Sequence, residues 1–576
     1  MEQKYPVYSE ETRCQDCYKC IRECPVKAIK VVDGEAELMP EHCILCGHCV
    51  AVCPVGAKRV RDDLRRAMHL IQRKRIVILS LAPSFAGEFV SIPAEKLIAA
   101  IKKLGFHGVS ETALGAQEVS AYVKSQIAGA TGGIMLSSAC PSAVDLITRY
   151  YPEFTECITG VYSPLLAHCV MLRKMYGDDI GIVFAGPCIA KKKEADMHPE
   201  LLDLAITFED LRKWFDIGNI DPASIENTGN DLFIPETARN GALYPIEGGM
   251  IQTLQGGNDT TRYMTLSGVD TIQGALRTLA HTTGNGHTLF IELLACKNGC
   301  IKGPKATSTT PVGSRMAVLD YSVNAEPSSL LVQDRIMHEY SDNRISHKRM
   351  TQTELQAALE QIGKYTKEEE LNCGSCGYGS CRDFAVALIE NKAEACMCVS
   401  YMRKLAQKKA NALIKTIPYG VVIVDKQLKI IESNTHFAAL FGNDVEEIEK
   451  VIPGLKNADL SKIVPFHQLF TQVILTGEEI TQQFVRYENR VIAVTIFTVE
   501  EAKIAGAILR DATMTESKRE QIIEKAQEVI RNTSVTAQQI AFLMGKNAAQ
   551  SEKILTSLID SFSVKEQNDL IDEGGL

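Results

Sequence analysis

The sequence has few aromatic residues, no excess of positive charge and no long apolar run. One Trp and 6% aromatic residues in 576 leave little for base stacking, and a net charge of −9 argues against a nucleic-acid partner. No stretch approaches 18 uninterrupted apolar residues and no apolar signal core is present, so we expect neither a membrane span nor secretion. We therefore expect a cytoplasmic protein, and the length predicts about four domains.

Cysteine is what the chain has in quantity, with 19 residues. Thiols stay reduced in the cytosol, so these cysteines are better interpreted as metal ligands than as disulfides. Two N-terminal runs both read C-x2-C-x2-C-x3-C-P, the bacterial ferredoxin pattern for two [4Fe-4S] clusters, in which the fourth cysteine serves the other cluster. Zinc is the alternative for such pairs, and the doubled run with both prolines favours iron. The predicted ligands in domain 1–62 are Cys14, Cys17, Cys20 and Cys53 for cluster one, and Cys43, Cys46, Cys49 and Cys24 for cluster two.

Residues 75–345 predict an α/β domain with largely buried strands. Apolar runs such as IVILSLAP and IGIVFAG alternate there with amphipathic helix patterns such as AEKLIAAIKKLGF. Three cysteine loops, at Cys140, Cys188 and Cys296/Cys300, each follow directly after such a run. Loops at the carboxyl ends of strands are where α/β folds gather ligands, so these four cysteines are candidates for one buried cluster. Isolated core cysteines are the alternative.

These three loops resemble the active-site signatures of the [FeFe], or iron-only, hydrogenases, whose patterns are TSCCP, MPCxxKxxE and ECMACxGGC. Here they read SACP from Ser138, GPCIAKKKE from Gly186 and ELLACKNGC from Glu292. The resemblance covers residues 1 to about 345. It implies an H-cluster, a cube joined through one thiolate to a two-iron unit that carries CO and cyanide. The implied cube ligands are Cys140, Cys188, Cys296 and Cys300.

The same resemblance implies roles for Cys300 as the bridging thiolate and for Lys191 as a donor to a cyanide ligand. A solvated basic run is the alternative for Lys191. Ala139 replaces the family cysteine that begins the proton relay, and a methyl group cannot carry a proton, so we expect slow turnover. Other departures are Gly186 for a Met and two leucines for sulfur-bearing residues. Weak candidates for another relay, more simply explained as structural residues, are Ser163, Tyr244, Glu247 and Cys169.

A further motif in domain 366–403 reads C-x2-C-x4-C-x16-C and resembles a small four-cysteine cluster domain of electron-transfer proteins. The stretch RDFAVALIENK predicts a helix that carries the last ligand of one more [4Fe-4S] cluster. Cys396 competes with Cys398 for that place, and zinc is again the alternative. The predicted ligands are Cys373, Cys376, Cys381 and Cys398, which leaves Cys157, Cys169 and Cys396 as inert thiols.

The last third resembles a PAS sensory domain over residues 408–512. Its pattern is helix, strand, polar turn, strand and a helix restart at Asn434, followed by two apolar runs predicted to be neighbouring antiparallel strands. The lone His436 and His467 give no argument for a haem or flavin. Residues 513–565 predict an amphipathic helix for signalling or dimerisation, with packing onto the PAS domain as the alternative.

Together these patterns predict a multidomain α+β and α/β protein of the sensory hydrogenase subgroup that responds to H2. The expected partners are H2, a redox protein such as ferredoxin, a separate signalling protein of the kinase or phosphatase class, and a second copy of the chain. No nucleic acid or membrane partner is expected. Two alternatives stay open: a slow ferredoxin-linked hydrogenase, and an iron–sulfur scaffold that lacks the two-iron unit.

Overall fold

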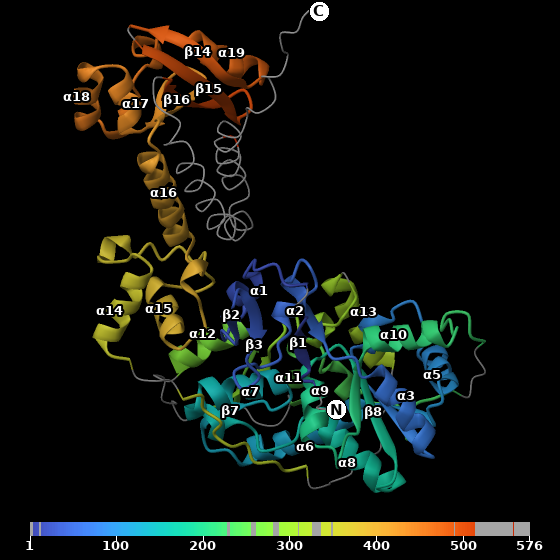
Figure 1. Ribbon diagram of the computed structural model, residues 1–576. Coiled ribbons are helices and arrows are strands. Elements are labelled where there is room, and N and C mark those ends of the chain that lie inside the picture. Colours follow the sequence, from blue (N-terminus) through green and yellow to red (C-terminus); the bar gives the residue numbers. More distant parts are fainter. Residues whose placement is uncertain are drawn as a thin grey trace, which may run out of the picture. The chain divides into compact units, whose positions relative to one another are not determined.

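The computed structural model describes residues 4–10, 13–226, 231–254, 261–279, 287–308, 310–324, 336–346, 350–488, 490–512 and 557 (Figure 1). The chain forms two compact units. The first comprises Met1–Glu360 and Lys364–Glu394, and the second comprises Gln361–Gly363 and Ala395–Leu576. In the described part of the chain, no helix combines the length and the apolar character needed to cross a bilayer. The predicted helix at 513–565 lies outside the described residues except for Ser557.

A cysteine-rich module opens the first unit. Its strands form a hairpin and an antiparallel pair, and its two short helices each end at a cysteine followed by proline. Because proline disfavours the helical conformation of the residue before it, Cys24 and Cys53 leave the helices in extended conformation. The elements are β1 (Val7–Ser9), α1 (Lys19–Glu23), β2 (Ile29–Val32), β3 (Glu35–Leu38), α2 (His48–Val52) and β4 (Lys58–Val60).

The larger domain of the first unit is built on two parallel sheets. One has the order β6-β5-β8-β9 and the other β10-β11-β7. The α/β prediction is confirmed. The apolar runs IVILSLAP and IGIVFAG form strands, and a helix is present over AEKLIAAIKKLGF. The strands are β5 (Val77–Leu81), β6 (Gly108–Glu111), β7 (Gly133–Leu136), β8 (Gly181–Gly186), β9 (Leu204–Thr207), β10 (Thr261–Ser267) and β11 (Thr288–Leu294).

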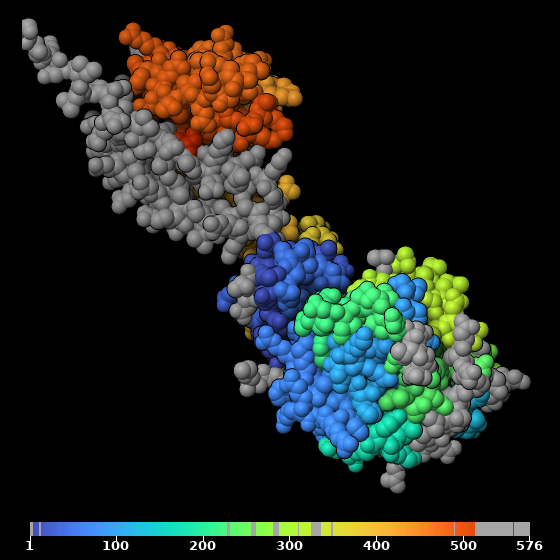
Figure 2. All heavy atoms as spheres, turned by 90° about the vertical axis from the view of Figure 1, so that its right-hand side faces the viewer, coloured from blue at the N-terminus to red at the C-terminus, as the bar shows by residue number. Residues whose placement is uncertain are grey.

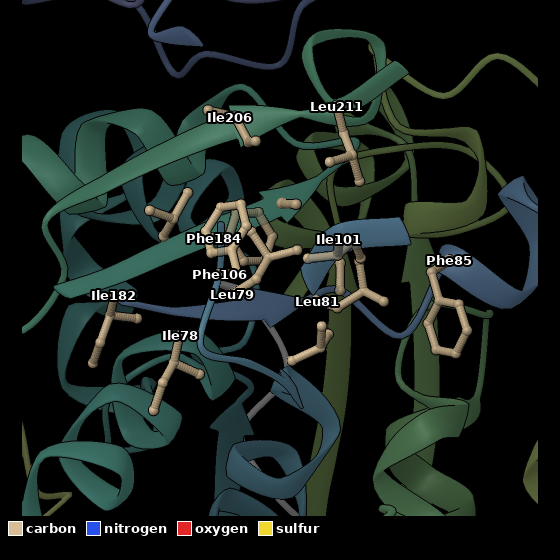
Figure 3. Close-up of a cluster of buried hydrophobic side chains, with 14 of the residues drawn as sticks. Ile78, Leu79, Leu81, Phe85, Ile101, Phe106, Ile182, Phe184, Ile206 and Leu211 are labelled. Atoms are coloured by element: carbon tan, nitrogen blue, oxygen red, sulfur yellow. The ribbon is translucent and has the colours of Figure 1, made fainter. Parts of the chain in front are cut away.

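Every residue of β5, β6, β8 and β9 is buried, as expected for parallel strands covered on both faces. Figure 3 shows Ile78, Phe184 and Ile206 from three of these strands packed with Ile101 and Leu211 of two covering helices. The helices of this domain are α3 (Leu64–Arg73), α5 (Ala94–Lys103), α6 (Thr112–Gly129), α7 (Pro141–Tyr150), α8 (Pro164–Tyr176), α9 (Ala190–Met197), α10 (Phe208–Ile217), α11 (Gly249–Leu254), α12 (Val269–Leu279) and α13 (Pro311–Asn324), with a short turn of helix at α4 (Phe85–Glu88).

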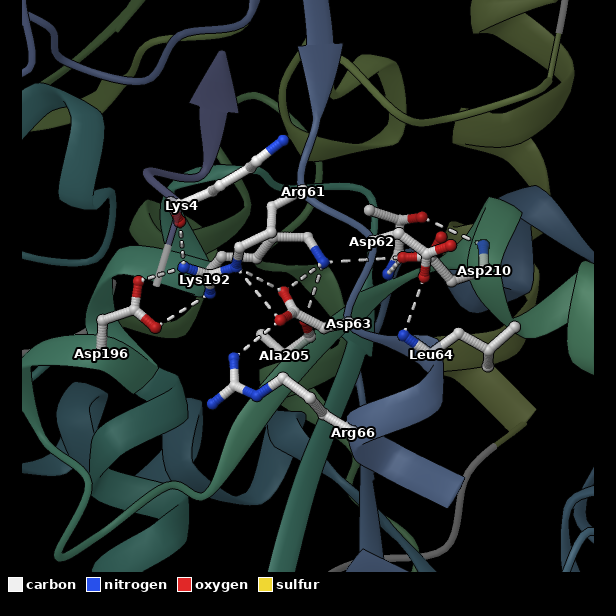
Figure 4. Close-up of polar contacts among 11 residues, drawn as sticks. Lys4, Arg61, Asp62, Asp63, Leu64, Arg66, Lys192, Asp196, Ala205 and Asp210 are labelled. Atoms are coloured by element: carbon white, nitrogen blue, oxygen red, sulfur yellow. Dashed lines mark hydrogen bonds and ion pairs between the residues drawn. The ribbon is translucent and has the colours of Figure 1, made fainter. Parts of the chain in front are cut away.

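A buried charge network joins α3, α9 and β9 (Figure 4). The Lys192 ammonium is fully buried and donates to Asp63 at 2.9 Å and to the Ala205 carbonyl at 3.0 Å. Arg61 binds the same Asp63 carboxylate at 3.0 Å and Asp196 at 2.8 Å. Burial alone would raise the pKa of Asp63, but Lys192 and Arg61 hold it below its ordinary value. The basic run at 191–193 is therefore not the solvated run considered from the sequence.

The last segment of the first unit holds α14 (Gln352–Gln361) and α15 (Cys381–Ile389). The predicted helix over RDFAVALIENK is present, but the expectation that it carries the last cysteine is wrong. It begins at Cys381, with Ser380 accepting a hydrogen bond from the Asp383 amide as its N-cap, and ends before Cys398. The chain turns after this helix at Asn391, which has a positive φ two residues past the helix end.

The second unit contains α16 (Val399–Thr416), which starts directly after its N-cap Cys398, and a five-stranded antiparallel sheet of order β13-β12-β16-β15-β14. The predicted helix restart at Asn434 is present, and the two late apolar runs pair as neighbouring antiparallel strands. Asn434 also donates to the carbonyls of Ile414 and Tyr419, which ties the end of α16 to the sheet. The remaining elements are β12 (Gly420–Asp425), β13 (Ile430–Ser433), α17 (Thr435–Leu440), α18 (Asn443–Val451), α19 (Gln468–Thr476), β14 (Ile480–Tyr487), β15 (Arg490–Glu500) and β16 (Ile504–Asp511).

The buried network predicts an asymmetric response to the loss of a lysine. Lys192→Met should lower the free energy of unfolding by about 3 kcal/mol, because Asp63 keeps a buried charge with one partner fewer. Lys74→Met is the matched control, since its Asp179 partner is almost fully exposed, and should cost less than about 1 kcal/mol. Urea unfolding followed by fluorescence of Trp214, the single Trp of the chain, measures this domain alone. Equal losses in the two variants would contradict the role of Lys192.

Candidate metal centre

Four predicted ligand cysteines meet at one enclosed cavity. Cys140 is the N-cap of α7 after β7, Cys188 follows β8, and Cys296 and Cys300 follow β11. The carboxyl ends of strands from both sheets thus bring three loops together, as the sequence predicts. The cavity is lined mainly by apolar side chains, together with these four sulfurs and the Cys46 sulfur of the N-terminal module.

The donor set of this cavity fits an iron–sulfur cube. Burial raises the pKa of Cys188 to about 11 and also raises the pKa values of Cys296 and Cys300, so a bound cation would favour their thiolate forms. Within the described residues, no group of three His, Cys, Asp or Glu side chains is arranged to hold a single metal ion. Four cysteine thiolates are the usual ligand set of one [4Fe-4S] cube.

Two buried N-terminal thiols are influenced by different sets of neighbouring cysteines. The Cys20 thiol, whose pKa burial raises to about 11, is also influenced by the charges of Cys14, Cys17 and Cys53. Burial likewise raises the pKa of the Cys49 thiol, where Cys46, Cys43 and Cys24 act as the charged neighbours. The crossed assignment of the fourth cysteines is therefore compatible with the structure.

Lys191 lies beside the cavity in a buried ion pair. Lys191 is 9% exposed, and its ammonium donates to Glu194 at 2.7 Å and to the Ser163 hydroxyl at 2.9 Å. Its charge also acts on the thiols of Cys188 and Cys300, so the ammonium is close to both loops. Ser163 additionally caps α8 by accepting from the Leu166 amide, which fixes its position.

A second cavity, of about 300 Å³, begins on the other side of Glu194. Its lining includes Ser138, Glu194, His198, His338 and Tyr340. The two histidine rings lie 5.8 Å apart, and the Tyr340 ring packs edge-on to His338 at 4.7 Å. Titratable groups thus extend from the Lys191 ion pair into a space bordered by exposed residues.

The departures from the family patterns have local structural reasons. A Cβ at Gly186 would lie 2.5 Å from the Phe184 ring and 2.8 Å from the Ala82 methyl, so no larger residue fits without a shift. Leu293 and Leu294 are buried at the end of β11. Ala139 is half-buried and packs with the apolar cluster under α6.

The other relay candidates are held in structural contacts. Tyr244 bonds Ser120 at 2.8 Å, Glu247 accepts from the Asn298 amide at 2.9 Å, and Cys169 is fully buried in the core. Glu292, the first residue of the third loop pattern, was given no role from the sequence, but its carboxylate accepts from the Met250 amide at 2.9 Å and from the Gly248 amide at 2.8 Å. Its sequence signals are its place in that pattern and a carboxylate inside an otherwise apolar strand.

Sequence reasoning also missed how closely the N-terminal module approaches the four-cysteine cavity. Gly47 has a φ of +78°, and a Cβ placed on it would lie 2.3 Å from Pro304 and 3.0 Å from Ile189. Arg149 near the end of α7 donates to the Cys43 carbonyl at 3.0 Å. Figure 2 shows the blue N-terminal residues in continuous contact with the larger domain. These contacts place Cys46 against the cavity.

The cysteines of the third motif differ in exposure. Cys373 is exposed, Cys376, Cys381 and Cys396 are half-buried, and Cys398 is buried. The choice between Cys396 and Cys398 as fourth ligand stays a prediction. Cys157 is half-buried, and its role as an inert thiol also stays a prediction.

Three family models match the chain. The model for the iron-only hydrogenase large subunit, C-terminal domain, matches residues 75–304, the 4Fe-4S dicluster domain matches 6–54, and an Fe–S cluster model matches 369–400. The chain is thus an iron–sulfur protein in which three cluster modules follow one another. More particularly, its residues 75–304 are similar to the C-terminal domain of the iron-only hydrogenase large subunit.

Solved structures include similar folds. One [FeFe]-hydrogenase, from work on oxygen inactivation of the H cluster, is 15% identical, with 50% of this chain and 100% of that chain covered and a TM-score of 0.40. A variant of [FeFe]-hydrogenase HydA1 from Chlamydomonas reinhardtii is 16% identical, with the same coverage and a TM-score of 0.39. The PAS domain of an HTR-like protein from Haloarcula marismortui is 19% identical over 19% of this chain and 93% of that chain, with a TM-score of 0.14.

The close approach at Gly47 yields a matched pair of substitutions. Gly47 and Gly56 both have positive φ, but a Cβ at Gly56 meets nothing within 4 Å. Ala at either position pays the backbone cost of about 1 kcal/mol, and only Gly47→Ala also collides with Pro304. We expect Gly47→Ala to be less stable than Gly56→Ala by about 1–3 kcal/mol in thermal unfolding. Similar melting temperatures would contradict the docking contact.

Proposed function

We propose that this chain is an H2-responsive iron–sulfur protein of the sensory hydrogenase subgroup. The observation that carries the proposal is the single buried cavity at which Cys140, Cys188, Cys296 and Cys300 meet beside the Lys191 ammonium. The group implied there is an H-cluster, which when bound supplies an open iron site for H2. Cys300 would hold the two-iron unit, and the other three cysteines would complete the binding of the cube.

The chain's own residues give this site its electrostatic character. Lys191 offers a charge-assisted donor in dry surroundings, where hydrogen bonds to anionic ligands such as cyanide are strongest. Glu194 and Ser163 fix the direction of its ammonium. Apolar side chains such as Leu294 and Pro304 exclude water from the cavity. The Ala139 methyl ends the relay that a cysteine would begin, which favours slow turnover and therefore a sensing role.

The second unit is the proposed output module. Its five-stranded antiparallel sheet, with the last strand β16 in the centre and the helices α17, α18 and α19 between the second and third strands of the chain, supports a PAS domain. Changes of cluster charge would act on this domain, and a kinase- or phosphatase-class partner would read them. An exchange of electrons with a soluble carrier such as ferredoxin and a dimer through the C-terminal helix belong to the same proposal.

A slow catalytic hydrogenase is the second candidate, and the 300 Å³ cavity favours it. Heterolysis of H2 releases a proton that has to reach solvent. Glu194 accepts from Lys191 on one side and borders the cavity with His198 and His338 on the other. These groups offer a path that does not need a thiol at Ala139. A scaffold with cubes alone is the third candidate, for which no particular contact in the structure argues.

Infrared spectroscopy tests the H2 proposal directly. In anaerobically purified and cluster-matured protein, we expect bands in the CO and cyanide region that shift when H2 is added. Lys191→Met should move the cyanide bands more than the CO bands, because the ammonium is lost as a donor. A matured control hydrogenase shows that loading works. With that control positive, the absence of bands would leave only the iron–sulfur scaffold.

A substitution at Ala139 separates the sensor from the catalyst. If the active site is intact and lacks only a relay, Ala139→Cys should raise H2 oxidation by about 100-fold, the usual scale of general acid–base catalysis. Ala139→Ser adds similar volume without a thiol and should give little gain. Initial rates with an artificial electron acceptor measure the effect. Unchanged rates in both variants would mean that another step limits turnover.

A further inference from the structure

The four-cysteine segment after residue 369 is docked on the N-terminal cysteine-rich module. The Val31 amide of β2 donates to the Lys392 carbonyl at 3.0 Å, and the Gly34 amide donates to Glu394 at 3.4 Å. Gly377 packs against α1, so closely that a Cβ would lie 3.0 Å from Ile21 and 3.2 Å from an α1 backbone nitrogen. Two regions more than 330 positions apart in the sequence therefore form one surface within the first unit.

Lys27 and Tyr378 occupy the centre of this contact. The Lys27 ammonium donates to the carbonyls of Ile21 and Arg22, both at 3.0 Å, and lies 6.0 Å from the centre of the Tyr378 ring. The Lys27 amide donates to the Cys24 carbonyl at 3.3 Å, and Tyr378 follows Cys376 by two residues. The Lys27 side chain therefore lies between the segment of one cluster-two ligand and the segment of one ligand of the C-terminal motif.

The Tyr378 hydroxyl is buried and has no hydrogen-bond partner among the described residues. Buried hydroxyl groups nearly always have partners, so an unpaired one indicates a missing acceptor. The acceptor that would satisfy this hydroxyl is a cluster sulfur or thiolate at the same place, and such hydrogen bonds tune cluster potentials.

Cluster two also approaches the four-cysteine cavity. The cysteine motif assigns both Cys24 and Cys46 to this cluster. Cys46 lines the cavity, and its charge acts on Cys296. The cysteines of cluster one do not line the cavity. On the side of cluster one, Asp16 and Glu394 are close enough for their like charges to act on each other. Two negative charges at this place disfavour an electron added to a cluster beside them.

We propose that cluster two is the junction of the chain, through which the C-terminal four-cysteine cluster exchanges single electrons with the cavity across the Lys27–Tyr378 contact. One electron leaves a reduced cube and one oxidised cube accepts it, with H2 or a reduced carrier as the source. Lys27 and Tyr378 are positioning residues that favour the reduced state at this contact. Cluster one is then a side branch for exchange with a soluble carrier. The inference rests on the clusters of the proposed function, but not on H2.

Redox titration of the full chain, reconstituted with iron and sulfide only, tests this route. Dithionite and electron paramagnetic resonance replace H2 and infrared bands. Tyr378→Phe and Lys27→Met should each lower the population of the reduced cube at the contact about tenfold, equal to about 59 mV for one electron. Lys30→Met, a partly exposed lysine paired with Glu37 on the same hairpin, should leave all potentials unchanged.

A glycine pair tests the docking itself. Gly377→Ala should weaken the magnetic coupling between the reduced C-terminal cube and cluster two, because the added Cβ meets α1. Gly374→Ala carries the same positive-φ cost and meets only the Tyr378 carbonyl, at 3.8 Å, so its coupling should match that of the unmodified chain. Cys20→Ser and Cys43→Ser alter the spectra of cluster one and cluster two respectively, and so assign the signals.

The outcomes separate the two proposals. The route would be overturned by magnetic coupling of the C-terminal cube to cluster one, or by a shifted potential of cluster one in the variants. It would also be overturned if neither Lys27→Met nor Tyr378→Phe changed any potential. Each of these outcomes would leave the H2 proposal intact. Normal shifts in a protein that lacks CO and cyanide bands would support the route and remove only the H2 proposal. A chain that binds no iron and sulfide would overturn both.

Discussion

The burial of sulfur that has to carry negative charge is the constraint on which this architecture depends. The thiols of Cys188, Cys296 and Cys300 are buried, which raises their pKa values, and a cation in the cavity would favour their thiolate forms. Folding of the three loops and binding of iron are therefore linked. Lys191 and the start of α7, where Cys140 is the N-cap, supply the positive potential that the protein itself offers.

Helix α7 relates the two neighbouring cysteine sites. Its N-cap Cys140 lines the four-cysteine cavity, and its last residues Arg149 and Tyr150 donate to the carbonyls of Cys43 and His42. A ten-residue helix is about 15 Å long, so one rigid element sets the spacing of the two sites. The left-handed turn at Gly47 then lets the module close onto Pro304. Both contacts involve ordinary packing, and neither depends on a bound group.

The sequence allowed the local parts of this structure to be predicted, but not the contacts between distant ones. The apolar runs at β5, β8 and β11 identify buried parallel strands, and four cysteines predicted as ligands line one cavity. The ion pair of Lys192 with Asp63 and the contact of Tyr378 with Lys27 could not be predicted, because the residues of each pair lie far apart in the chain. The error over α15 has a local cause: the amphipathic pattern fixes the helix, but not that Cys381 begins it.

The position of Cys398 at the N-cap of α16 has a geometric consequence within the second unit. The eighteen-residue helix runs from this sulfur to the strand β12, and Asn434 fixes its far end by bonding Ile414 and Tyr419. Successive residues of an α-helix are rotated by about 100° around the helix axis. The number of residues in α16 therefore sets the direction in which the Cys398 sulfur points relative to the sheet. An insertion of one residue would turn the sulfur away, whereas four would nearly restore it.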